Sequence, residues 1–152
     1  MELSLSSSKS NPIFDIVDHW IRRVLVIDDD ETILQMVCSK LEYEGYEVWP
    51  ASGGKNALEI IDRRGLPHLA IVDIHMPGMD GFEFCEIVQQ YADLPIIFLT
   101  AVDDEETIIR GIKYFAEDYV TKPFSPRQLA ARVERILHRI SDFSYAEGSK
   151  VR

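Results

Sequence analysis

Three carboxylates follow two apolar runs of this sequence and carry most of its chemical information. The run 24–27 leads directly into Asp28 and Asp29, and the run 69–72 leads directly into Asp73. An unpaired charge is costly to bury, and three carboxylates brought together would repel each other. A divalent cation and a lysine placed between them would relieve that repulsion, and both are parts of sites that handle phosphate.

The elements that must position these side chains are predicted by short apolar runs that alternate with helical patterns. Strands are expected at 23–28, 46–50, 69–73, 96–100 and 118–121, and helices at 31–44, 54–64, 80–91, 104–115 and 126–140. Strands that alternate with helices form a parallel sheet through right-handed crossovers. The first, third and fourth runs are continuously apolar, as strands buried on both faces should be, so the other two are expected at the edges. The predicted fold class is α/β, a doubly wound five-stranded parallel sheet of order 2-1-3-4-5 with helices on both faces.

The carboxyl ends of parallel strands meet at one edge of the sheet, and ligands bind there at the switch point between strands 1 and 3. That edge is expected to collect Asp28, Asp29, Asp73, Thr100 and Lys122. Carboxylate oxygens favour Mg²⁺, which binds through one or two carboxylates together with a phosphate. The lysine would supply a cation for phosphoryl oxygens, and the threonine a hydroxyl donor. A carboxylate that attacks phosphorus would form an acyl phosphate.

Four segments of the sequence resemble one known family. They are V-L-V-I-D-D-D-E, I-V-D-I-H-M-P-G-M-D-G, P-I-I-F-L-T-A and D-Y-V-T-K-P-F, and they are similar to motifs of the receiver (CheY-like) domain of bacterial two-component response regulators. The resemblance covers roughly residues 22–140. It implies a phosphorelay signalling domain that accepts a phosphoryl group from the phosphohistidine of a sensor histidine kinase, or from a phosphotransfer protein, and then switches conformation to control an output partner or domain. It implies no enzymatic activity beyond Mg²⁺-dependent autophosphorylation and autodephosphorylation.

The resemblance also implies a role for each residue of the acidic site. Asp73 would be the phospho-acceptor. Asp29 and Asp73 would ligate Mg²⁺, with Asp28 acting mainly through water and the backbone carbonyl of His75 as a further ligand. Lys122 would pair first with the Asp73 carboxylate and then with the phosphoryl group.

A second set of residues is implied to switch. After phosphorylation Thr100 would move toward the phosphoryl oxygen, and Tyr119 would turn inward to fill the space. Family members commonly have a cis bond where this chain has Lys122-Pro123. One departure from the family is bulky Phe115, which stands where Gly-Ala is frequent, in the loop before the fifth predicted strand.

Two other interpretations compete with a working receiver. The D-x-D-x-T pattern at 28–32 also fits the nucleophile motif of haloacid-dehalogenase-like phosphatases, with 103–104 as a later acidic pair. Those enzymes place their lysine before that pair, whereas Lys122 follows it, and this interpretation gives Asp73 no role. The other is a receiver used only as a docking module and never phosphorylated.

The last predicted helix suggests one branch of the family. Residues 125–133 resemble the last receiver helix of the winged-helix transcription-factor branch, the OmpR/PhoB type. Arg110, Asp118 and Arg132 stand where that branch places charges for dimerisation. This predicts a possible homodimer through the predicted helix 104–115, strand 118–121 and helix 126–140. A solvated helix face is the alternative explanation for these charges.

Composition limits the remaining possibilities. The net charge of −10 argues against nucleic acid contact by this chain, which would need a basic footprint. No apolar stretch approaches the roughly 18 residues that span a membrane, and no secretory signal is visible, so we expect a cytoplasmic protein. Cys38 and Cys85 lack metal-ligand spacing and are expected to be reduced core thiols.

The 152 residues are divided into three parts. Residues 1–21 are predicted to be a flexible tail with a short amphipathic helix at 12–21, and residues 22–140 the receiver domain. Residues 141–152 are polar and are predicted to be a linker or a C-terminal tail.

Overall fold

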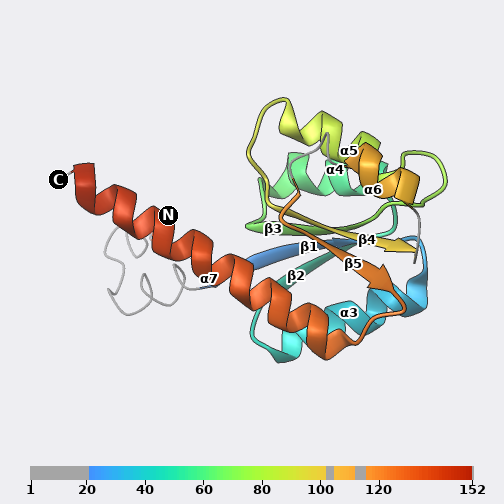
Figure 1. Cartoon of the computed structure of the whole chain (residues 1–152), viewed down its shortest axis with the longest axis horizontal. Helices are drawn as coiled ribbons and strands as arrows, with labels where there is room; N and C mark the ends of the chain where they lie inside the picture. The colour runs from blue at the N-terminus through green and yellow to red at the C-terminus, as the bar shows by residue number, and fades with distance from the viewer. Residues whose placement is uncertain (1–20, 102–104, 112–115, 152) are drawn as a thin grey trace, which may run out of the picture.

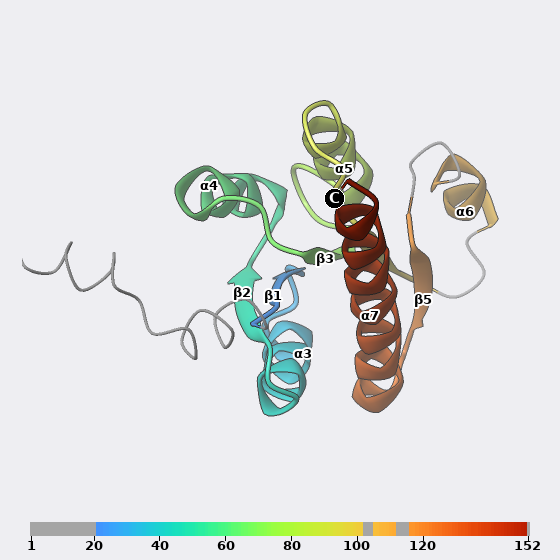
Figure 2. The same ribbon diagram turned by 90° about the vertical axis from the view of Figure 1, so that its left-hand side faces the viewer.

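A parallel sheet organises the part of the chain that the structure describes. The computed structural model describes residues 21–101, 105–111 and 116–151. Its strands are β1 (Arg23–Ile27), β2 (Glu47–Ala51), β3 (Leu69–Asp73), β4 (Ile96–Ala101) and β5 (Asp118–Lys122). They pair in parallel in the order β2-β1-β3-β4-β5, with β2 and β5 at opposite edges (Figure 2). The predicted strand order and the two predicted edge strands are confirmed.

Helices cover both faces of this sheet. They are α3 (Glu31–Tyr43), α4 (Gly54–Arg64), α5 (Gly81–Gln89), α6 (Glu105–Gly111) and α7 (Pro126–Val151). One face carries α4, α5 and α6, and the opposite face carries α3 and α7 (Figure 1). The arrangement is the predicted doubly wound, CheY-like α/β fold.

The apolar runs are continuous because each central strand contributes side chains to two hydrophobic cores, one on each face of the sheet. In β1, Leu25 and Ile27 pack in the core beneath α4 and α5, while Val24 and Val26 pack in the core beneath α3 and α7. All four side chains are fully buried. Successive residues of a strand point to opposite faces, so burial on both sides requires an apolar residue at every position.

Two aspartates fix where helices begin next to the sheet edge. Asp30 caps α3 by accepting hydrogen bonds from the backbone N–H of Thr32 at 2.9 Å and of Ile33 at 3.3 Å. Asp80 forms a capping box with Glu83 at the start of α5. The segments 28–30 and 74–80, which lead from the ends of β1 and β3 into these helices, are therefore fixed at their helix ends.

The last helix is the main difference from the predicted limits. The sequence predicts it over 126–140, whereas α7 continues to Val151. The prediction was too short because it took the polar residues after 140 for a tail, although no proline or glycine interrupts the chain before Gly148. Apart from the fourth predicted helix, whose predicted ends lie outside the described residues, the other elements end within about two residues of their predicted limits, which is the usual uncertainty of such boundaries.

Some predictions lie outside the described residues. These are the tail and nearly all of the helix expected at 12–21, and part of the fourth helix expected at 104–115. The proposed domain limits therefore stay predictions. Within the described ranges, no helix combines the length and hydropathy that crossing a bilayer requires.

Candidate functional site

Two neighbouring strands bring the three predicted carboxylates together. Asp28 and Asp29 follow the last residue of β1, and Asp73 is the last residue of β3, which pairs with β1 in parallel. One carboxylate oxygen from each residue lies within 4.8 Å of the others. Asp28 and Asp73 are only 1% and 5% exposed, whereas Asp29 is exposed. The cluster thus has two buried carboxylates and one that opens to solvent.

Lys122, the last residue of β5, reaches across the sheet edge to both buried carboxylates. Its Nζ lies 3.0 Å from Oδ2 of Asp28 and 3.3 Å from Oδ2 of Asp73. The Lys122-Pro123 peptide bond is cis, as the resemblance implies. One ammonium group shared between two buried carboxylates leaves the cluster with excess negative charge.

Backbone donors hold the other oxygen of each buried carboxylate. Oδ1 of Asp28 accepts a hydrogen bond from the N–H of Asp30 at 2.9 Å. Oδ1 of Asp73 accepts one from the N–H of His75 at 3.3 Å. Both carboxylates are therefore oriented by the turns that follow their strands. His75 lies in the turn beyond β3, close to the cluster, and a ligand role for its carbonyl stays a prediction.

Burial and repulsion between neighbouring carboxylates shift the pKa values of the site. Burial, followed by the charge of Asp28, raises the pKa of Asp73 from 3.8 to about 6, although Lys122 and the His75 N–H oppose the rise. Burial alone would lower the pKa of Lys122, but the hydrogen bond to Asp28 and the charges of both aspartates raise it. The lysine therefore stays charged, and the Asp73 carboxylate remains less stabilised than an ordinary one.

Thr100 and Tyr119 lie on the neighbouring strands β4 and β5. Thr100 is 1% exposed, and its hydroxyl donates a hydrogen bond to the carbonyl oxygen of Ala101 at 3.3 Å. Tyr119 is half-buried and pairs in register with Phe98, with ring centroids 5.7 Å apart. Both residues are placed where the resemblance implies, and the switch itself stays a prediction.

Sequence reasoning missed Gly81, the first residue of α5. A Cβ at this position would lie 2.6 Å from the carbonyl oxygen of Asp73 and 2.9 Å from Cα of Ile74. The N–H of Gly81 also donates to the carbonyl of Ile74 at 2.9 Å. The close approach of Gly81 to the backbone of Asp73 and Ile74 fixes the position of the end of β3. The available signal was the glycine that ends the I-V-D-I-H-M-P-G-M-D-G segment.

The residues predicted for a dimer face make ion pairs within the chain. Asp118 accepts a hydrogen bond from Arg132 at 2.6 Å and lies 3.5 Å from Arg135. Arg110 lies 3.8 Å from Asp80, and its guanidinium stacks 5.0 Å from the centroid of a neighbouring phenylalanine ring. These pairs are compatible with a solvated helix face as well as with an interface.

The geometry does not favour the phosphatase interpretation. Its D-x-D-x-T motif needs Asp30 as a second catalytic carboxylate, but Asp30 is occupied in capping α3. The later acidic pair at 103–104 lies outside the described residues. Asp73, which that interpretation does not use, is instead one of the two buried carboxylates of the cluster.

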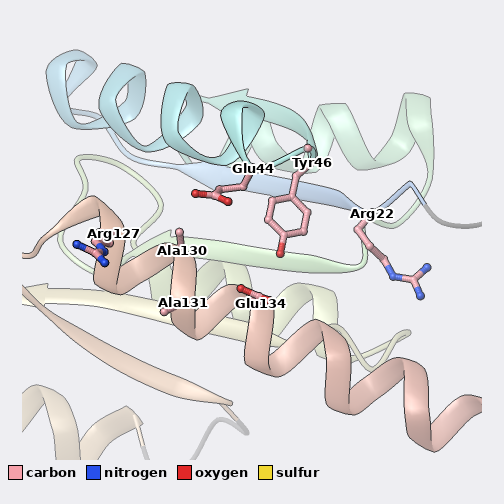
Figure 3. A pocket seen from close by; sticks show the side chains of 8 residues that line it. Arg22, Glu44, Tyr46, Arg127, Ala130, Ala131 and Glu134 are labelled. Carbon is pink, nitrogen blue, oxygen red and sulfur yellow. The ribbon is translucent and has the colours of Figure 1, made fainter.

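A hollow of about 420 Å³ lies elsewhere, between α3 and α7 (Figure 3). Its lining consists of Arg22, Glu44, Gly45, Tyr46, Arg127, Ala130, Ala131 and Glu134. Burial, followed by the charges of Glu134 and Glu44, raises the pKa of Tyr46. No residue of the acidic cluster lines this hollow, so it is separate from the candidate site.

Comparison with known proteins gives consistent similarities. The family described as "Response regulator receiver domain" matches residues 24–134. The "Probable transcriptional regulator ycf27" of Porphyridium aerugineum is 39% identical over 122 residues, which cover 80% of this chain and 50% of that protein. The chain thus spans about half the length of the curated relatives it matches.

Solved structures of receiver domains are also similar. The receiver domain of a Francisella response regulator is 37% identical, with a TM-score of 0.72, and the match covers 78% of this chain and 98% of that one. The BeF3-activated DrrB receiver domain is 32% identical, with a TM-score of 0.68 and the same coverage.

Proposed function

This chain belongs to the family of response regulator receiver domains, phospho-accepting signalling modules rather than enzymes, and we propose that Asp73 accepts the phosphoryl group. The observation that carries the proposal is the position of Asp73 within the acidic cluster, 3.3 Å from Lys122. Asp28 is more deeply buried and closer to the lysine, so its carboxylate is less free to react. The raised pKa of Asp73 also makes its carboxylate a more basic nucleophile than an ordinary aspartate.

The proposed transfer is a substitution at phosphorus. An oxygen of Asp73 forms a bond to the phosphorus atom while the bond to the donor's histidine nitrogen breaks, and the imidazole leaves with the electron pair. Lys122, already in contact with Asp73, then pairs with the phosphoryl oxygens. Thr100 gives up its hydrogen bond to Ala101 and donates to the same group.

The donor set fits a hard divalent cation. Three carboxylates whose oxygens lie within 4.8 Å of one another form the kind of oxygen site that Mg²⁺ prefers. We assign Asp28, Asp29 and Asp73 to this ion, with the backbone carbonyl of His75 as a further ligand. When bound, Mg²⁺ neutralises charge on the carboxylates and on the incoming phosphoryl oxygens.

Receiver domains interact with histidine kinases, and we propose a sensor histidine kinase or a phosphotransfer protein as the donor here. The relative named as a transcriptional regulator supports assignment to the OmpR/PhoB-type branch. Control of transcription would then be the output of a longer assembly to which this chain contributes the receiver. We place this activity in the cytoplasm.

Phosphorylation of Asp73 is tested by labelling with a small phosphodonor such as acetyl phosphate. We expect an acid-labile adduct that requires Mg²⁺, is abolished by Asp73→Asn and is weakened by Asp28→Asn. Asp62→Asn, which changes an exposed carboxylate on α4, is the matched control and should label like the wild type. An adduct that survives Asp73→Asn but is lost in Asp28→Asn would support the phosphatase mechanism instead. A wild-type chain that is not labelled would support the docking module.

We further propose that phosphorylation favours a homodimer through α6, β5 and α7. The support is the pairing of acidic Asp118 with Arg132 and Arg135 on the exposed face of these elements. Each exposed pair contributes on the order of 0–1 kcal/mol, so partners can be exchanged between two copies at little cost. Two-fold symmetry would repeat every such contact.

Sedimentation with and without beryllofluoride tests this dimer. The free chain should be mainly monomeric, and the beryllofluoride-treated chain should shift toward dimer. Arg132→Glu should prevent the shift, whereas Arg63→Glu, an equal charge change on α4, should not. An unchanged mass, or a dimer indifferent to Arg132→Glu, excludes this interface.

A further inference from the structure

Three aromatic rings pack beneath the end of α6. Phe82 of α5 and Phe98 of β4 meet edge to face with centroids 5.1 Å apart, and Tyr119 of β5 packs on Phe98 with centroids 5.7 Å apart. Gly111, the last residue of α6, lies buried directly against this group. The ring of Tyr119, the residue proposed to switch, therefore lies in a recess between α5, β4 and α6, which we call its seat.

The seat exists because residue 111 has no side chain. A Cβ on Gly111 would lie 2.6 Å from the hydroxyl oxygen of Tyr119 and 3.1 Å from Cε1 of the same ring. It would also lie 3.1 Å from Cε1 of Phe82. Contacts below 3.0 Å between a Cβ and a heavy atom essentially never occur, so one neighbour has to move.

Of these neighbours, Tyr119 is the one that can move. Phe82 is 1% exposed and Phe98 0%, and both are part of the close-packed core. The guanidinium of Arg110 lies 5.0 Å from the centroid of the Phe82 ring and is held near Asp80, which braces that ring from outside. Tyr119 is half-buried on an edge strand, so its ring can rotate out toward solvent.

We propose that Gly111 is a positioning residue for Tyr119, and that the missing side chain at 111 sets how much of the population keeps the tyrosine ring seated under α6. This inference rests on the proposed switch role of Tyr119. The position of the end of α6 relative to β5 then depends on whether the Tyr119 ring is seated. While the ring is seated, the end of α6 is held at its present distance from β5, and when the ring leaves, that contact is lost. Occupancy of the seat thus couples Tyr119 to the face proposed for dimerisation.

The test is Gly111→Ala in protein labelled with 3-fluorotyrosine and observed by ¹⁹F NMR, with Tyr119→Phe used to assign the resonance. We expect the Tyr119 resonance of Gly111→Ala to move and to become accessible to a soluble paramagnetic probe. Burial, with a smaller contribution from Cys85, raises the pKa of Tyr119 above 10, so the displaced ring should also titrate at lower pH. Gly53→Ala is the matched control, because Gly53 has extended backbone and nothing within 4 Å of its Cβ position.

The outcome separates this inference from the function on which it rests. Gly111 contacts none of the acidic cluster, so Gly111→Ala should still be labelled at Asp73, but beryllofluoride should no longer change its Tyr119 resonance. Loss of labelling in the wild type would refute the proposed function. Normal labelling with an unmoved Tyr119 resonance in Gly111→Ala would refute the role of Gly111.

Stability measurements give a second, independent criterion. Alanine has a higher helix propensity than glycine, so Gly111→Ala alone should not destabilise α6. The substitution should be destabilising only while the Tyr119 ring occupies the seat and contacts the new Cβ. We expect its effect on Tm to be unfavourable in the wild type and clearly less so in a Tyr119→Ala background. An equal effect in both backgrounds would show that the clash is with Phe82 alone and would overturn the proposal.

Discussion

Asp73→Asn should stabilise the metal-free protein. The Asp73 carboxylate is 5% exposed, shares Lys122 with Asp28 and has no other charged partner among the contacts of the described residues. An amide has nearly the same shape but no charge. The substitution therefore removes the repulsion from Asp28 and leaves Lys122 paired with one carboxylate.

The size and pH dependence of the effect follow from the raised pKa. A native-state pKa of about 6 against 3.8 means that the folded protein holds this proton more tightly than the unfolded chain. The free energy of unfolding therefore falls as the pH rises from about 4 to about 6, and the loss persists above that range. At about 1.4 kcal/mol per pKa unit the loss reaches about 3 kcal/mol, so Asp73→Asn should gain about 1–3 kcal/mol at pH 7.

Urea denaturation in EDTA at several pH values measures this difference. The wild type and Asp73→Asn should have equal free energies of unfolding below about pH 4. Between about pH 4 and 6 Asp73→Asn should become the more stable protein. Asp62→Asn corrects for the general effect of removing one negative charge. Added Mg²⁺ should stabilise the wild type by mass action and Asp73→Asn much less. An Asn variant that is less stable than the wild type at pH 7 in EDTA would refute this account of the site.

Further predictions concern other residues of the described structure. Lys122→Ala leaves two buried carboxylates without their shared cation, so we expect a loss of about 1–3 kcal/mol at pH 7 in EDTA, partly recovered with Mg²⁺, and greatly reduced labelling of Asp73. Gly81→Ala forces a Cβ against backbone atoms and should lower the free energy of unfolding by about 1–3 kcal/mol in the same denaturation assay. Burial raises the pKa of Cys85 to about 12 and, with nearby acidic side chains, that of Cys38 to about 11, so iodoacetamide should modify neither thiol in the native state at pH 8.

The fold was predictable from sequence because its signals are local and agree with one another. Continuous apolar runs identified β1, β3 and β4 as central strands, and the topology of a parallel sheet then placed the carboxyl ends of all its strands, β5 included, at one edge. The positions of Asp28, Asp73 and Lys122 follow from that placement without any knowledge of side chains. The end of α7 was not predictable in the same way, because polar residues at 141–147 fit a helix as well as a tail.

Packing at atomic distance was not visible in the sequence. The sequence does not distinguish Gly81 from Gly111, yet a Cβ at position 81 would meet backbone at the end of β3, whereas a Cβ at position 111 would meet the ring of Tyr119. Likewise, the resemblance to the OmpR/PhoB-type branch assigned Asp118 and Arg132 to one face but did not show that they pair with each other within one chain. Such contacts depend on how elements far apart in sequence pack, and no local pattern encodes them.

The charges of the acidic site suggest why a phosphoryl group would drive a conformational change. Phosphorylation would replace the single negative charge of Asp73 by a phosphoryl group of about −1.5 to −2 with three acceptor oxygens, in a place that already holds buried Asp28. Lys122 is in contact before transfer, so its pairing offsets part of the added charge without movement. The next donor along the sheet edge is the hydroxyl of Thr100, which is turned to the carbonyl of Ala101 and has to move to reach the new oxygens. Because Thr100 is buried on the strand beside Tyr119, such a movement changes the space next to the tyrosine ring. The excess negative charge that destabilises the unphosphorylated site is thus the same property that makes its response to phosphorylation structural.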